Sequence, residues 1–233
     1  MVTAAIAAGG SGHRMGTETP KQFLEIAGVP VIIRTISVFL ENPLIDHIIV
    51  GIHPGWCEHF NGLIEIYIKD SSKISVIAGG ADRNGTICNM VEKAAESFSL
   101  CDDDIFLTHD AARPFVESRI IAANIDAAGK YGVCTSAIAA ADTILRCTED
   151  GFVRDIPARR EMYQCQTPQS FKYGLFKKVV SQLSEEELAA ATDVSSLFLL
   201  MGYEVKIVEG SINNFKITYP EDLERAESLA RKI

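Results

Sequence analysis

Short apolar runs alternate with longer segments of helical period through most of the chain. This alternation is typical of β-α-β units, in which parallel strands are buried between two layers of helices. The runs predicted as strands are Val2–Ala7, Ile48–Ile52, Ile74–Ala78, Ile105–Thr108 and Cys134–Ile138. The segments predicted as helices lie near Val31–Leu40, Trp56–Ile68, Asn84–Phe98 and Ser118–Tyr131. The pattern therefore predicts an α/β fold with a mainly parallel sheet.

The alternation stops between about Ala139 and Gln166. Two short β-rich stretches, Asp142–Ile144 and Phe152–Val153, flank the turn sequence Thr148–Gly151, which predicts a projecting hairpin. The elements expected after it are helices near Tyr173–Gln182 and Asp193–Met201, strands at Glu204–Val208 and Phe215–Ile217, and a last helix with capping-box spacing from Thr218 to Glu221. Because no repeat or low-complexity linker interrupts the chain, we expect one domain over residues 1–233 with this hairpin as an arm.

Composition and charge disfavour several classes of protein. The chain has 233 residues, of which 47% are hydrophobic, and this suits a globular domain with a sizeable core. No apolar stretch approaches the roughly 18 residues of a membrane-spanning helix, and the start lacks the features of a secretory signal, so we expect a cytoplasmic protein. The net charge of −9 without a basic run argues against binding to nucleic acid or an anionic membrane. The cysteines are far apart without a CxxC pair, which predicts free thiols.

A glycine-rich segment follows the first predicted strand and is the most informative part of the sequence. Gly9, Gly10 and Gly12 allow backbone N–H groups to approach a phosphate closely, and Arg14 and Lys21 add two long cations. The segment has no Gly-Lys-Ser/Thr and lacks the last glycine of a dinucleotide-binding fingerprint, which disfavours a nicotinamide-dependent oxidoreductase. It favours a triphosphate with its pyrophosphate leaving group. An ordinary strand-to-helix turn with solvated cations is the alternative.

Two further motifs follow predicted strand ends. Asp110 and Arg113 are expected at the carboxyl edge of the sheet, where they either contact a substrate or form an internal salt bridge. Gly80 and Thr86 flank the start of the next helix, where a base or ribose can approach the backbone closely. Arg83, between them, is equally consistent with an exposed residue at the helix start.

The ordered motifs resemble those of the cytidylyltransferases that act on small polyol phosphates, over nearly the whole chain. The motifs that carry the resemblance are Ala7–Gly16 with Pro20–Phe23, Gly79–Arg83, His109–Pro114, Gln166–Gln169, Thr192–Asp193 and Asn214–Thr218. Glycine loops with Arg and Lys also occur in other sugar-phosphate nucleotidylyltransferases, whereas this combination is more specific. The resemblance implies a Rossmann-like sheet with a β-arm, at about residues 139–166, that reaches into the partner subunit of a homodimer.

The resemblance also implies roles for single residues. The implied catalytic residues are Arg14, Lys21 and Lys216, although the apolar neighbours of Lys216 predict by themselves a solvent-exposed side chain. The implied nucleotide-binding residues are Ala8, Gly9, Gly10, Gly12, Gly80 and Thr86. The implied substrate-binding residues are Asp110, Arg113, Thr143, Arg159 and Thr167, of which Thr143 and Arg159 would act from the arm in the partner's site. Mg²⁺ or another divalent cation is the implied cofactor, with few protein ligands and Asp110 as the one candidate.

The reaction implied by the resemblance is transfer of CMP from CTP to a polyol phosphate, with release of pyrophosphate. Because the nucleophile is already an anion, we expect positioning and cationic stabilisation to supply catalysis without a general base. Asp82–Asn84 and Glu161–Gln164 favour D-ribitol 5-phosphate, with CDP-ribitol as product, as the leading prediction. Ala112 and Thr192–Ser196 favour the alternative, 2-C-methyl-D-erythritol 4-phosphate of isoprenoid biosynthesis. A nucleotide-binding regulator without catalysis is a distant third reading.

Overall fold

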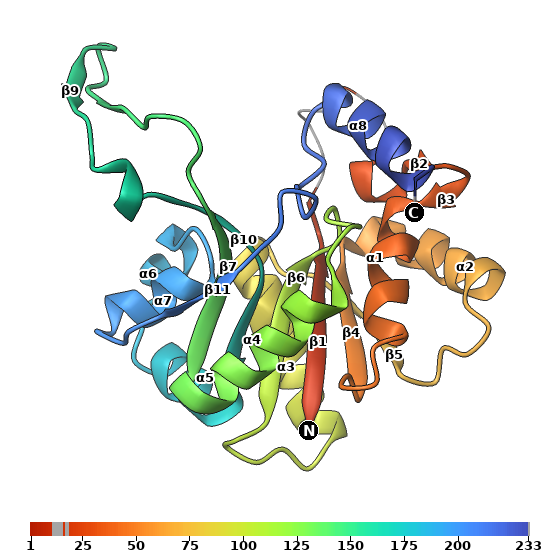
Figure 1. Cartoon of the computed structure of the whole chain (residues 1–233). Coiled ribbons are helices and arrows are strands. Elements are labelled where there is room, and N and C mark those ends of the chain that lie inside the picture. Colours follow the sequence, from red (N-terminus) through yellow and green to blue (C-terminus); the bar gives the residue numbers. More distant parts are fainter. Residues whose placement is uncertain (11–15, 17–18, 233) are drawn as a thin grey trace.

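A computed structural model describes residues 1–10, 16 and 19–232. Its centre is a seven-stranded sheet with the strand order β11-β7-β10-β6-β1-β4-β5 (Figure 1). The strands are β1 (Val2–Ala8), β4 (His47–Ile52), β5 (Ile74–Ala78), β6 (Ile105–Asp110), β7 (Val133–Ala139), β10 (Tyr163–Lys172) and β11 (Lys206–Glu209). All neighbouring pairs are parallel except those that β10 forms with β6 and β7. The predicted α/β fold with a mainly parallel sheet is therefore confirmed.

Strand β10 was not among the predicted strands, and its sequence explains why. It is rich in glutamine and contains Pro168, which cannot donate to a ladder and is rarely found in a central strand. The register against β7 shifts between Cys165 and Gln169, so the proline lies in an irregular stretch of the ladder. The buried polar side chains of Gln166 and Gln169 find hydrogen-bond partners in neighbouring loops. Tertiary contacts therefore stabilise a strand that local propensity does not favour.

Alternate residues of the central strands enter two separate cores. Ala4 and Ile6 of β1 pack on one face of the sheet, and Ala5 packs on the other. The first face is covered by α1 (Val31–Leu40), α2 (Cys57–Tyr67) and α4 (Ser118–Tyr131). The second is covered by α3 (Arg83–Ser97), α5 (Tyr173–Val180) and α7 (Val194–Leu200), with the short α6 (Glu185–Ala190) alongside α3. None of the helices described is long and apolar enough to cross a membrane.

The arm leaves the sheet between β7 and β10 and projects away from the rest of the molecule (Figure 1). It holds the antiparallel pair β8 (Arg146–Cys147) and β9 (Val153–Asp155) and a 3-10 turn, η4 (Arg159–Glu161). The predicted hairpin is present, but its first strand lies after Asp142–Ile144 rather than within it. The turn sets this register, because the Thr148 N–H donates to the Phe152 carbonyl at 2.9 Å and so pairs Cys147 with Val153.

The last segment of the chain differs from its prediction in two respects. No strand forms at Phe215–Ile217, where the Ile217 N–H donates to the Ala112 carbonyl of a loop at 2.9 Å. Helix α8 (Pro220–Ala230) has Tyr219 rather than Thr218 as its N-cap, and Asp222 rather than Glu221 supplies the capping carboxylate. This carboxylate accepts the Thr218 and Tyr219 N–H groups at 2.8 and 2.9 Å. The helix packs on the small hairpin of β2 (Glu25–Ile26) and β3 (Val29–Pro30).

Candidate active site

A cleft of about 570 Å³ opens where β1 and β6 end at the carboxyl edge of the sheet. In Figure 1 the arm and α8 rise on opposite sides of this edge. Eight of the predicted site residues line the cleft: Ala8, Gly9, Gly10, Lys21, Gly80, Thr86, Asp110 and Lys216. The structure thus brings together residues from four separate motifs, in a volume that suits a nucleotide-sized ligand. The predicted residues Gly12 and Arg14 lie outside the part of the chain that the structure describes.

The backbone that follows β1 is held in place by a buried glutamine. The Gln22 side chain is 3% exposed, and its Nε2 donates to the carbonyls of Ala8 at 2.8 Å and Gly10 at 3.1 Å. Gln22 belongs to a 3-10 turn, η2 (Lys21–Phe23), which also brings Lys21 to the cleft wall. The PKQF sequence therefore holds the backbone at Ala8 and Gly10 and supplies a cation in the same turn.

A neighbouring part of the cleft wall is formed by the loop between β5 and α3. The Thr86 hydroxyl donates to the Asp82 carbonyl at 2.7 Å and accepts the Gly80 N–H at 3.0 Å. A Cβ atom at Gly80 would lie 2.6 Å from the Gly85 carbonyl carbon, so a larger residue would push this loop off the helix. Asp82 is the N-cap of α3 and accepts the Gly85 N–H at 2.8 Å. The hydroxyl of Thr86, predicted as a contact to the base, is in this structure engaged in holding the loop.

Asp110, the last residue of β6, is surrounded by three cations. Its Oδ1 accepts Nε of Arg83 at 3.0 Å, and its Oδ2 lies 2.9 Å from Nζ of Lys216 and 3.5 Å from Nε of Arg113. Burial by itself raises the pKa of Asp110, but the charges of Arg83, Lys216 and Arg113 outweigh it and hold the pKa well below the ordinary value. The internal Asp110–Arg113 salt bridge considered from the sequence is present, as one part of a larger cluster.

Two of these cations differ from the sequence expectations. Lys216 does not point freely to solvent, because its ammonium group is bound to Asp110. Arg83 is not an exposed residue of the helix start, because its guanidinium extends across the cleft wall to β6. A hint was available in the sequence: Arg83 directly follows the helix N-cap, where a cation is disfavoured by the helix dipole and therefore needs a nearby anion.

His109 and Thr167 lie behind Asp110 in a closed network. The His109 Nε2–H donates to the Arg113 carbonyl at 3.1 Å, which leaves Nδ1 to accept the Thr167 hydroxyl proton at 2.9 Å. The Thr167 hydroxyl in turn accepts the Asp110 N–H at 3.2 Å. Burial is the main cause that lowers the pKa of His109 to about 4, so the ring is neutral at pH 7. Thr167, predicted to bind the substrate, is 4% exposed and holds Asp110 from behind instead of lining the cleft.

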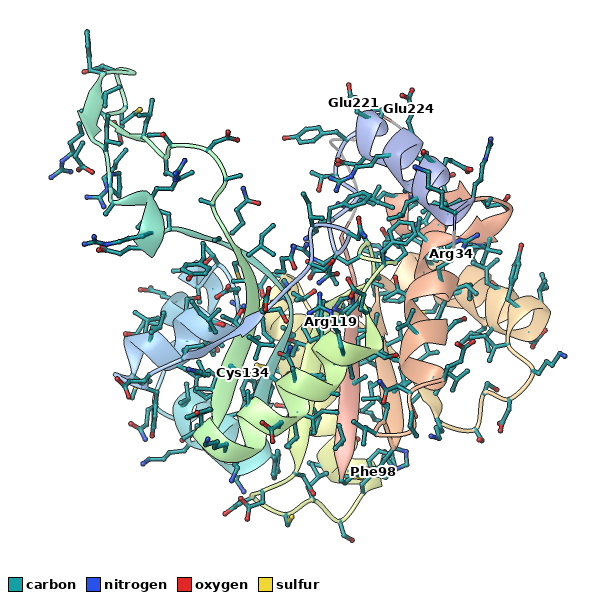
Figure 2. All side chains as sticks on the ribbon, viewed as in Figure 1. Arg34, Phe98, Arg119, Cys134, Glu221 and Glu224 are labelled. Atoms are coloured by element: carbon teal, nitrogen blue, oxygen red, sulfur yellow. The ribbon has the colours of Figure 1, made fainter. Side chains whose placement is uncertain are left out.

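The loop that carries Lys216 is anchored by buried amides. Gln166 Nε2 donates to the Ser211 carbonyl at 2.8 Å, and Asn214 Nδ2 donates to the Thr167 carbonyl at 2.7 Å. Nη2 of Arg119, at the start of α4 (Figure 2), donates to the Gly210 carbonyl at 3.2 Å. Gln166 and Asn214 therefore have a structural role: their side chains fix the backbone of the Lys216 loop relative to Asp110.

Thr143 and Arg159 lie on the arm and do not line this chain's own cleft. Arg159 Nη1 donates to the Ala141 carbonyl at 3.3 Å, and both side chains are exposed. In Figure 2 the arm projects away from the body of the molecule and carries side chains on all sides. Their predicted action in the site of a partner subunit is compatible with this placement.

The cleft is cationic although the chain is acidic. Among the residues that the structure describes, its charged lining consists of Lys21, Arg83 and Lys216 against Asp82 and Asp110, three positive charges against two negative and hence a net charge of +1. The whole chain has a net charge of −9. The positive charge of the cleft favours an anionic ligand there. The negative charge of the whole chain disfavours the binding of polyanions to the rest of its surface.

The comparison with known proteins gives one consistent result. The family model described as 2-C-methyl-D-erythritol 4-phosphate cytidylyltransferase, IspD, matches residues 2–232. The chain is similar to the crystal structure of 4-diphosphocytidyl-2C-methyl-D-erythritol synthase from Anaerococcus prevotii, at 28% identity and a TM-score of 0.80, over 99% of this chain and 96% of that one.

Two further solved structures agree with this result. The 2-C-methyl-D-erythritol 4-phosphate cytidylyltransferase of Francisella tularensis is 28% identical with a TM-score of 0.81, over 97% of this chain and 98% of that one. The enzyme of the same name from Thermus thermophilus is 27% identical with a TM-score of 0.76, over 98% of each chain. With the cationic cleft and its ordered motifs, the match over almost the whole length shows that this chain belongs to the IspD family and is a cytidylyltransferase that acts on a polyol phosphate.

Proposed function

We propose that this protein transfers CMP from CTP to 2-C-methyl-D-erythritol 4-phosphate. The observation that carries the proposal is the family match over residues 2–232, joined to a cleft in which Lys21, Arg83 and Lys216 converge. The relatives named above are all described as acting in methylerythritol phosphate chemistry. The comparisons therefore favour the methylerythritol alternative over D-ribitol 5-phosphate, which the sequence motifs had placed first.

The proposed reaction needs charge stabilisation more than proton transfer. An oxygen of the polyol phosphate attacks the α-phosphorus of CTP, a new P–O bond forms, and the bond to the β-phosphate breaks as pyrophosphate leaves. The attacking oxygen is already anionic at pH 7, so no base has to remove a proton. His109 fits this view, because both ring nitrogens are engaged with Arg113 and Thr167 and the ring is neutral.

The cations of the cleft have distinct roles in this proposal. Lys21 and Arg14 bind the triphosphate and the leaving pyrophosphate, and Lys216 binds near the α-phosphate. The electrostatic stabilisation that each cation provides increases as negative charge develops in the transition state, and fixed cations accelerate such transfers in this way. Before the nucleotide binds, the Lys216 ammonium is paired with Asp110 at 2.9 Å.

The residues of the cleft suit a divalent cation that arrives with the nucleotide. No cluster of three or more acidic, histidine or cysteine ligands occurs in the described part of the chain. Of the two carboxylates in the lining, Asp82 caps α3 and Asp110 is bound to cations. Triphosphate oxygens and water would therefore supply most ligands of a bound Mg²⁺, and Asp110 would be the one candidate ligand from the protein. The metal would neutralise part of the phosphate charge.

A homodimer completes the proposed site. The arm exposes several large apolar side chains within a short stretch, among them Phe152 at 75% and Ile156 at 60%, and such a concentration favours an interaction surface. If the arm covers a second copy of the chain, Thr143 and Arg159 come to the partner's polyol phosphate. Arg159 then supplies the cation that the polyol end of the site requires.

The experiment that tests the function offers both polyols to the purified protein. CTP and Mg²⁺ are incubated with each polyol phosphate separately, pyrophosphate release is measured, and the CDP product is identified by mass spectrometry. We expect turnover with 2-C-methyl-D-erythritol 4-phosphate and little with D-ribitol 5-phosphate. Turnover with the ribitol compound alone would overturn the choice of polyol, and no release with either would overturn the proposed function.

A further inference from the structure

Arg83 is the cation of the cleft for which neither the sequence nor the proposed reaction has yet supplied a role. It is the first residue of α3, and its Nε–H donates to Oδ1 of Asp110 at 3.0 Å. Among the residues that the structure describes, its Nη1 and Nη2 atoms are buried without a hydrogen-bond partner. Within the described part of the chain, the bond and ion pair with Asp110 are therefore what holds the guanidinium in place, and they offset the cost of burying its unpaired donors.

The two oxygens of Asp110 are used differently. Arg83 binds Oδ1, whereas Lys216 and Arg113 both approach Oδ2. Arg83 and Lys216 therefore do not compete for the same atom. When Lys216 is withdrawn from Oδ2, the carboxylate keeps Arg83 on Oδ1 at 3.0 Å, while Arg113 stays at the longer distance of 3.5 Å from Oδ2.

Of the three cations, Lys216 is the one best placed to leave. Its side chain is 35% exposed and lines the cleft, compared with 24% for Arg83 and 11% for Arg113. Arg113 is fixed through Nη1, which donates to the Asn214 carbonyl at 2.8 Å. A triphosphate in the cleft therefore competes with Asp110 for the Lys216 ammonium, whose attraction for a phosphate is reduced while the carboxylate neutralises its charge.

We propose that Arg83 is a positioning residue that remains on Asp110 as its counter-ion and so releases Lys216 to the nucleotide. The inference rests on the proposed function, since it assumes that CTP binds in this cleft. Without Arg83, Asp110 has only the cations on Oδ2 and holds Lys216 more strongly. Nucleotide binding is then weakened although Arg83 itself does not contact the nucleotide.

The test is a double-mutant cycle on the binding of Mg²⁺·CTP, measured by isothermal titration calorimetry. Arg83→Gln in the wild-type chain is expected to raise the Kd about 10-fold, the scale of one hydrogen bond to a charged group. Asp110→Asn removes the charge that retains Lys216. In that background Arg83→Gln is expected to change the Kd by less than about 3-fold, as for two residues that act through one contact.

Two more variants separate charge from fold. Arg83→Lys keeps a cation that can reach Oδ1, so its Kd is expected within about 3-fold of the wild type, since charge rather than fork geometry holds the contact. Lys93→Gln removes a cation from the exposed side of the same helix, where Lys93 pairs with Glu96 at 3.6 Å, and is expected to leave the Kd unchanged. Circular dichroism and thermal unfolding confirm that each variant is folded.

Three results would overturn the inference. They are an unchanged Kd in Arg83→Gln, an equal loss in the wild-type and Asp110→Asn backgrounds, and a loss in Arg83→Lys as large as in Arg83→Gln. Equal losses in both backgrounds mean that Arg83 acts on the nucleotide directly or through the total charge of the cleft. Because the cycle measures the binding of CTP without a polyol, its result does not depend on which polyol is the substrate. If the wild type turns over normally but Arg83 and Asp110 show no coupling, this inference is wrong while the proposed function still holds.

Discussion

The buried His109 gives a quantitative prediction about stability against pH. The pKa of His109 is lowered from its ordinary value of 6.5 to about 4, chiefly by burial, so the folded chain binds this proton far more weakly than the unfolded chain. Between pH 6.5 and pH 4 the unfolded state therefore binds more protons. The contribution of His109 to stability is fully present above pH 6.5 and is lost as the pH falls towards 4.

The size of this effect follows from the two pKa values. At about 1.4 kcal/mol per pH unit, the loss between pH 6.5 and pH 4 is about 3 kcal/mol, a large share of the stability of a typical domain. We expect His109→Gln to lack this part of the acid sensitivity, because the amide keeps a donor for the Arg113 carbonyl and an acceptor for Thr167 without gaining a proton. The variant is expected to be less stable than the wild type at pH 7, yet to lose less on acidification.

The assay is urea unfolding of both proteins at several pH values from 7 to 4. At each pH the free energy of unfolding of His109→Gln is subtracted from that of the wild type, which removes the contribution of the carboxylates that both chains share. This difference in the free energy of unfolding is expected to decrease by about 3 kcal/mol from pH 7 to pH 4. Parallel curves for the two proteins would refute the assignment of His109 as a buried neutral imidazole.

Four further outcomes follow from the site and the arm. Lys21→Ala and Arg14→Ala are each expected to lower turnover at least ~100-fold in a pyrophosphate-release assay, the scale of removing one charged stabiliser, and near-normal rates would contradict their roles. Gly80→Ala is expected to raise the KM for CTP at least about 10-fold while the protein stays folded, because its Cβ would lie 2.6 Å from the Gly85 carbonyl carbon, and an unchanged KM would argue against this wall as part of the nucleotide site. Phe152→Asp is expected to give monomers in light scattering where the wild type gives dimers, and a monomeric wild type would remove the role of the arm. Chelation with EDTA is expected to abolish turnover and Mg²⁺ to restore it; full activity in EDTA would contradict a metal carried by the nucleotide.

The parts of the fold that were predictable are those in which local pattern and tertiary burial agree. Helices α1 and α4 occupy the residues that their apolar period predicts, because the apolar stripe faces a core. Strand β10 escaped prediction because its buried face is polar and is satisfied by partners far away in the chain, such as the Asp193 carboxylate that accepts Gln169 Nε2 at 2.8 Å. The strand expected at Phe215–Ile217 was wrong, since the segment pairs with the Ala112 loop and has no neighbouring strand.

For the site, the sequence identified the residues that belong to it but not which of them contact one another. Gly9, Gly10, Lys21, Asp110 and Lys216 were recognisable by their motifs, and the structure places them around one cleft. That Lys216 is bound to Asp110, and that Arg83 shares the same carboxylate, depends on distances between residues far apart in the chain. A motif carries no such distances. Thr86 and Thr167 show the converse: both hydroxyls are bound to the protein itself, which only the folded geometry reveals.

The antiparallel strand in the middle of the sheet has a consequence for synthesis. Strand β6 has β10 as its neighbour, and β7, which comes before β10 in the chain, pairs with β10 and not with β6. A nascent chain that has completed β1, β4, β5 and β6 therefore carries an open β6 edge until the whole arm and β10 have been translated. Open edges recruit other strands, so truncated chains that end within the arm are expected to aggregate, and the chain depends on its later half to close the sheet.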